Sequence, residues 1–68
     1  MVEKSKMRLT VFVNRDEPES ISVYKGNKEE ALTGFAEEIF DDDPDTYETL
    51  KNAKRIIRAN HYMETFDL

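Results

Sequence analysis

The sequence predicts a single α+β domain: an antiparallel β-hairpin, then two packed helices and a short C-terminal third strand, in the order ββααβ. Two early segments alternate apolar and polar residues, as half-buried strands do. Two later segments carry apolar residues at helical spacing. With 68 residues the chain has room for one domain, which spans 1–68. Its first five residues, 1–5, are expected to be disordered.

The first strand is predicted from Lys6 to Asn14, where the pattern has a period of two. One face of this strand carries four apolar side chains, and we expect it to point toward the core: Met7, Leu9, Val11 and Val13. Phe12 lies on the opposite face, which indicates that both faces are partly covered and that the strand is central.

A second strand is predicted from Ser20 to Lys25, after a loop at 15–19 that contains a proline and charges. A connection of about five residues favours an antiparallel hairpin. Ile21 and Val23 are expected to point inward. Tyr24 would point outward and be half-buried under another element.

The first helix is predicted to begin after Asn27, a good N-cap, with Glu30 three residues later to complete a capping box. The apolar residues that follow form one stripe that would face the sheet: Ala31, Leu32, Phe35, Ala36, Ile39 and Phe40. Gly34 is expected to lie away from this stripe.

The second helix is predicted to begin at Pro44, with Asp43 as its N-cap, and to continue to about Asn60. Asp45 with Glu48 offers a second capping register. The apolar residues of this helix would be buried: Tyr47, Leu50, Ala53 and Ile57.

Residues 61–68 are predicted to add a short edge strand with Tyr62, Phe66 and Leu68 on one side. The alternative is that they extend the second helix and then fray.

The charge is strongly segregated along the chain. Residues 29–50 contain nine of the 15 carboxylates and no lysine, arginine or histidine, whereas the other residues hold all ten lysines and arginines. The net charge of −5 is therefore the sum of −9 and +4. Such asymmetry is evidence about partners more than about fold.

Several of these carboxylates crowd the C-terminal end of the first helix, where the helix dipole disfavours them. We therefore expect a small protein-binding module that presents an acidic cluster to a basic surface of a partner protein, as a nucleic-acid mimic or inhibitor. The expected contact residues are Glu37, Glu38, Asp41, Asp42, Asp43 and Asp45. The alternative is a merely solvated acidic face.

A second hypothesis uses the opposite charge. Four cations lie on one face of the second helix and would contact nucleic-acid phosphates, with the protein acting alone or as a dimer: Lys51, Lys54, Arg55 and Arg58. The net negative charge makes nucleic acid the less favoured partner. A third hypothesis is a structural or assembly protein that acts through its own oligomer, such as a homodimer.

Other functional classes fit poorly. Asp41, Asp43 and Asp45 match the first positions of an EF-hand, but Thr46 stands where glycine is required. His61 with Glu64 supplies at most half a zinc site, and there is no cysteine. A lone histidine near a helix end is more often a capping contact. We expect no enzyme, metal, cofactor or membrane span, and a cytoplasmic location.

Overall fold

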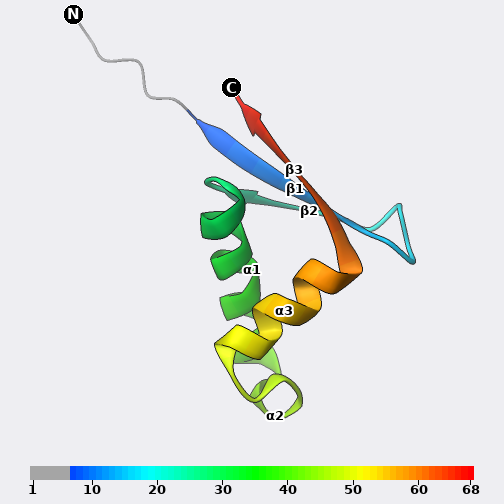
Figure 1. Cartoon of the computed structure of the whole chain (residues 1–68), viewed down its shortest axis with the longest axis vertical. Coiled ribbons are helices and arrows are strands. Elements are labelled where there is room, and N and C mark those ends of the chain that lie inside the picture. The colour runs from blue at the N-terminus through cyan, green and yellow to red at the C-terminus, as the bar shows by residue number, and fades with distance from the viewer. Residues whose placement is uncertain (1–6) are drawn as a thin grey trace, which may run out of the picture.

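The computed structural model describes residues 7–68 and confirms the predicted ββααβ order. Three strands form one antiparallel sheet, and the helices pack on one of its faces (Figure 1). The elements are β1 (Arg8–Asn14), β2 (Ile21–Lys25), α1 (Lys28–Asp42), α2 (Pro44–Tyr47), α3 (Leu50–Asn60) and β3 (His61–Asp67). The expectation for residues 1–5 lies outside the described residues.

The strand order is β2-β1-β3, so β1 is central, as predicted. Val11 pairs with Val23 of β2 on one side and with Glu64 of β3 on the other. The third strand follows α3 directly and is seven residues long, as long as β1, instead of the short strand expected. The alternative of a continued and fraying helix is therefore wrong.

The prediction of which strand faces point inward is wrong. Thr10 and Phe12 of β1 are fully buried beneath the helices, whereas Ile21 and Val23 of β2 are more than half exposed. Tyr24 lies on the helix-covered face, where its ring stacks on Phe35 with centroids 4.9 Å apart, so the expected half-burial is confirmed. The aliphatic face of the sheet is therefore the uncovered one.

The reason for this orientation lies in the side chains of α1 that meet the sheet. Ala31 and Ala36 are fully buried and small, so they leave room between the helix and the strands for a large side chain from the sheet. Phe12 fills the space between the layers and meets Tyr24 and Phe35 edge-on, with ring centroids 5.8 and 5.0 Å apart. A flat aliphatic surface would leave this space unfilled, and unfilled core volume is destabilising.

The start of α1 follows the prediction. Asn27 accepts a hydrogen bond from the Glu30 amide, and the Glu30 carboxylate accepts one from the Asn27 amide, which completes the capping box. Gly26 has a φ of 105°, a conformation that favours glycine at this turn between β2 and α1. Gly34 is partly buried near Tyr24: a Cβ there would lie 3.7 Å from the Tyr24 Cδ2 atom.

The second predicted helix is interrupted. Asp43 caps it as expected, but α2 ends after one turn at Tyr47, and Glu48 adopts a φ of 71°. Thr49 then caps α3 by accepting a hydrogen bond from the Asn52 amide at 3.0 Å. The Asn52 side chain donates back to the Tyr47 carbonyl at 2.8 Å, so side chains at the break satisfy one free backbone group at each of the two helix ends.

Candidate functional site

The C-terminal end of α1 and the one-turn α2 lie at the end of the molecule away from the sheet (Figure 1). All six predicted contact residues are exposed, and we call this group the acidic tip: Glu37, Glu38, Asp41, Asp42, Asp43 and Asp45. The last turn of α1 contains no basic residue. The carboxylates there face the negative end of the helix dipole without internal compensation.

Two members of the acidic tip have structural roles. Asp43 caps α2: its carboxylate accepts from the Thr46 hydroxyl at 2.7 Å and, more weakly, from the Thr46 amide. Glu38 accepts a hydrogen bond from the Tyr24 hydroxyl. Burial of the phenol, together with the neighbouring Glu38 carboxylate, raises the pKa of Tyr24 to about 12.

The other four members have no such role. Ion pairs within residues 7–68 form at two places, between Arg8 and Asp67 at 2.6 Å and between Lys54 and Glu29 at 3.3 Å. Neither pair involves the acidic tip. Glu37, Asp41, Asp42 and Asp45 therefore present their negative charge directly to solvent.

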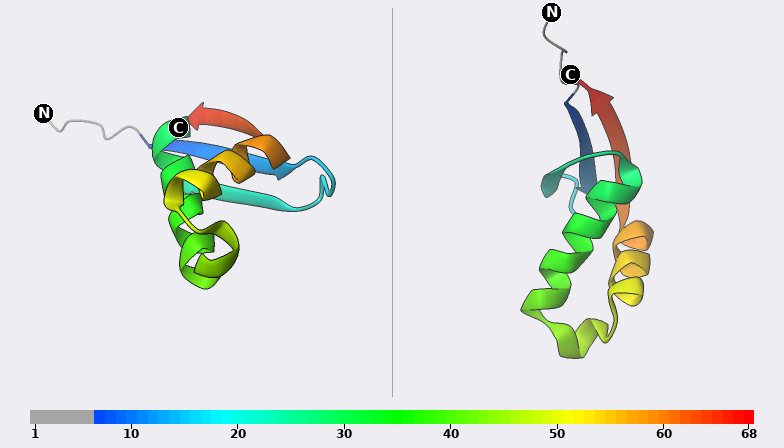
Figure 2. Two further views of the ribbon diagram at one scale, coloured as in Figure 1. Left: turned by 60° about the horizontal axis from the view of Figure 1, so that its bottom comes forward. Right: turned by 90° about the vertical axis from the view of Figure 1, so that its left-hand side faces the viewer.

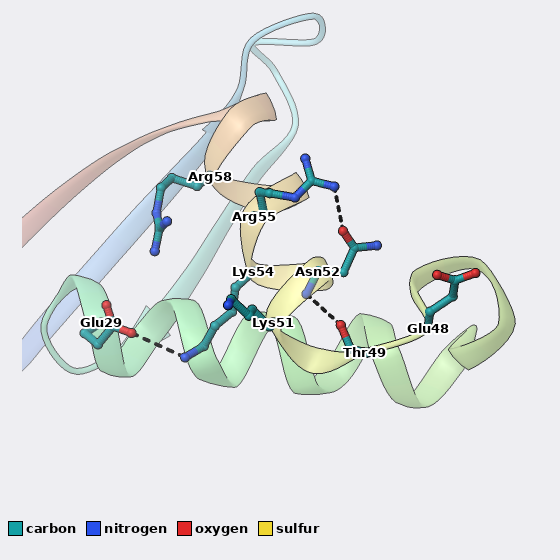
Figure 3. A pocket seen from close by; sticks show the side chains of 8 residues that line it. All are labelled: Glu29, Glu48, Thr49, Lys51, Asn52, Lys54, Arg55 and Arg58. Carbon is teal, nitrogen blue, oxygen red and sulfur yellow. Dashed lines mark hydrogen bonds and ion pairs between the residues drawn. The ribbon is translucent and has the colours of Figure 1, made fainter.

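The predicted basic face of the second helix lines a hollow of about 750 Å³ beside α3 (Figure 3). We call it the basic hollow. Its lining includes all four predicted cations, Lys51, Lys54, Arg55 and Arg58. It also includes four residues that were not singled out for binding from the sequence: Glu29, Glu48, Thr49 and Asn52.

Part of the charge in the basic hollow is already compensated. Lys54 reaches across to Glu29 of α1, as the dashed line in Figure 3 marks, and Arg55 donates to the Asn52 side-chain oxygen at 2.6 Å. Lys51 and Arg58 are exposed and belong to neither of the two ion pairs of the described chain. With Glu29 and Glu48 in the lining, four positive charges meet two negative ones.

Two of the residues that line the basic hollow carry no binding signal in the sequence. Thr49 and Asn52 belong to it because the chain breaks between α2 and α3 and caps α3 there. Thr is a residue type that favours the N-cap position, and this preference of Thr49 is the sequence signal for a helix start at this point.

His61 has the structural role that the sequence indicated. Its Nδ1 atom lies 2.9 Å from the Ile57 carbonyl at the end of α3, and its ring meets Phe12 and Phe35 edge-on. Across residues 7–68, no three histidine, cysteine or carboxylate side chains come together as a metal site would need.

No helix among the described residues is long and apolar enough to cross a bilayer. The comparisons with protein-family models, with curated proteins and with solved structures find no match to the chain. The site must therefore be interpreted from its own geometry.

Proposed function

We propose that the protein is a small binding module whose acidic tip docks on a basic surface of a partner protein. The observation that supports this function is the set of four exposed carboxylates, Glu37, Asp41, Asp42 and Asp45, none of which takes part in an ion pair of residues 7–68. Asp41 and Asp42 lie in the last turn of α1, where the helix dipole disfavours negative charge, and Asp45 lies in the first turn of α2. A partner cation would remove that unfavourable interaction.

The basic surface of the partner would be one that otherwise binds nucleic acid. Carboxylates spaced along a helix end can occupy the lysine and arginine side chains that would contact phosphates, and so block them. Complementary charge accelerates encounter and makes the association depend steeply on salt. The protein then acts as an inhibitor or competitor without any catalytic step.

Charge reversal at the acidic tip tests this function. The variant Asp41→Lys with Asp42→Lys should lose a partner that the wild-type chain captures from a source-cell lysate at low salt. The matched control is Asp16→Lys with Glu17→Lys in the exposed hairpin loop, which changes the net charge by the same amount. Capture that is equal for both variants and the wild type would rule out the acidic tip as the contact surface.

A second function is supported by the basic hollow, where tertiary structure gathers all four predicted cations on one concave surface. Nucleic-acid phosphates would bind there through Lys51 and Arg58, with Lys54 and Arg55 recruited from their internal partners. This function requires the acidic tip to remain turned away from the nucleic acid.

Fluorescence anisotropy with labelled duplex and single-stranded DNA at low salt separates the two functions. Nucleic-acid binding through the basic hollow predicts a log–log salt slope of about −2 to −4, since each phosphate contact contributes about −0.9 for duplex DNA and −0.7 for single strands. Lys51→Glu with Arg58→Glu should abolish it. The absence of binding by the wild-type chain would eliminate the second function.

A further inference from the structure

The uncovered face of the sheet is apolar. We call it the open face, and it contains every side chain of the sheet that points away from the helices. Of these, six large apolar residues are between 47% and 71% exposed: Met7, Ile21, Val23, Tyr62, Phe66 and Leu68. Leu9, Val11 and Val13 lie between them and are partly exposed. The acidic tip and the basic hollow lie elsewhere on the fold.

The area of this surface is at the upper end of what a monomer exposes. A Phe or Tyr side chain has about 150–250 Å² of surface and an aliphatic one somewhat less, so six large residues that are about half exposed present on the order of 600 Å². The largest apolar patch on a typical monomer is about 300–600 Å², and larger ones mark interaction sites. Two such faces in contact would bury about 1,200 Å², the lower limit for a specific interface.

We propose that the open face binds the open face of a second copy of this chain, so that two sheets pack face to face in a twofold-symmetric dimer. The sheets would lie about 10 Å apart with their strands within about 30° of each other. Both helical layers, both acidic tips and both basic hollows would remain exposed. The proposal therefore stands independently of the proposed function.

The two charged residues of the open face select the orientation. Lys25 is on β2 and pairs with Leu9, whereas Glu64 is on β3 and pairs with Val11, so β1 separates them within one copy. A twofold axis parallel to the strands places β2 of one copy opposite β3 of the other, which brings Lys25 close to the partner's Glu64. An axis across the strands would instead place the two Glu64 carboxylates on the same edge, where they repel.

Tyr62 marks one end of the open face. The Arg15 guanidinium lies over its ring at 4.5 Å from the centroid and shields it from solvent on that side. The open face therefore has a cation at this end, Lys25 at the end of one edge strand, and Glu64 between Tyr62 and Phe66 on the other edge strand. A polar rim around an apolar centre is the usual composition of a protein–protein interface.

Sedimentation equilibrium of the purified full chain, from about 1 μM to about 500 μM, tests the association. The expected result is a concentration-dependent shift from the 8.0 kDa monomer to a dimer of twice that mass. A wild-type chain that stays monomeric over this range overturns the proposal, and so does assembly beyond the dimer.

Two variants test whether the open face makes the contact. Val23→Glu places a charge at the centre of β2 on that face and should keep the chain monomeric throughout, with an unchanged circular-dichroism spectrum because Val23 is more than half exposed. Ser20→Glu adds the same charge beside the hairpin loop and should still dimerise. A Val23→Glu variant that dimerises like the wild type, for example by pairing of edge strands, contradicts the proposal.

The orientation has its own test. Lys25→Glu should weaken the dimer by about tenfold, because it sets two carboxylates against each other across the interface. Adding Glu64→Lys should restore the wild-type dissociation constant. Since β1 separates the two positions within one copy, such a rescue reports contact between copies. A double variant that is no tighter than the single one overturns the proposed orientation.

Discussion

The two faces of the sheet differ in what they bury. The helix-covered face carries few large side chains, of which Phe12 is fully buried and Tyr24 and Met63 are partly buried, together with hydroxyl groups. The open face carries most of the aliphatic side chains and leaves them exposed (Figure 2 shows the helices on one side of the strands). Hydrophobicity alone therefore did not decide which face the helices cover.

The shapes of the side chains account for this choice. The helices offer small side chains to the sheet, so one aromatic ring between the layers fills the space better than a row of branched aliphatics. The aliphatic face is then left for another surface.

Phe12 should be the most sensitive position of the sheet. Phe12→Ala is expected to lower the free energy of unfolding by about 3–5 kcal/mol, because it leaves a cavity between the helices and the strands. A domain of this size has only about 3–10 kcal/mol in total, so this variant is expected to be largely unfolded. Phe12→Leu should lose less and allow the change to be measured by urea denaturation. A loss below about 0.5 kcal/mol for Phe12→Leu would show that the covered face is not tightly packed.

Thr10 tests the polar part of the covered face. Its hydroxyl is fully buried, lies 2.8 Å from the Thr65 hydroxyl and donates to the Gly26 carbonyl at 3.0 Å. Thr10→Val keeps the shape but removes these hydrogen bonds, and should destabilise the chain by about 1–3 kcal/mol in urea denaturation. A variant as stable as the wild type would mean that solvent reaches this site.

Tyr24, on the helix-covered face, makes the free energy of unfolding depend on pH. Its pKa is raised from 10.0 to about 12, so the unfolded chain releases this proton before the folded chain does. The stabilisation from the neutral phenol is fully present below pH 10 and is lost as the pH rises to about 12. The stability difference between wild type and Tyr24→Phe, measured by urea denaturation, should therefore shrink between these values. A difference that stays constant would contradict the shifted pKa.

Val23 provides the contrast on the open face. In dilute solution, where the chain is monomeric, Val23→Thr should change the free energy of unfolding by less than about 0.5 kcal/mol, because the side chain is already more than half exposed. The same substitution should weaken the self-association measured at high concentration. A large loss of stability in dilute solution would mean that the open face is covered within one chain.

Local signals in the sequence predicted the elements of this fold well. The alternation from residue 6 to 14 located the central strand, and Asn27 with Glu30 located the start of α1 through a capping box that forms as expected. The apolar stripe of α1 also packs as predicted, with Ala31, Leu32 and Ala36 buried. Each of these features depends on residues within a few positions of one another.

The break at Glu48 was missed because it depends on two competing helix starts. Asp43 and Thr49 both act as N-caps and each begins its own helix, whereas the apolar spacing from Tyr47 to Ile57 suggested one continuous helix. As a result, the basic residues of α3 face a hollow closed by Thr49 and Asn52, which no periodic pattern indicates. The candidate acidic residues, by contrast, were identified by their sequence alone, and all of them are exposed.

Local propensity and the spacing of residue types are enough to specify the strands, the helices, their order and the segregation of charge. The side of the sheet that meets the helices is set instead by packing between elements that are distant in the sequence. Alternation with a period of two assigns the side chains of a strand to two faces, but it does not say which face the helices cover. That choice depends on the fit of side-chain volumes across the layers. That fit buries Phe12 and leaves the aliphatic face open.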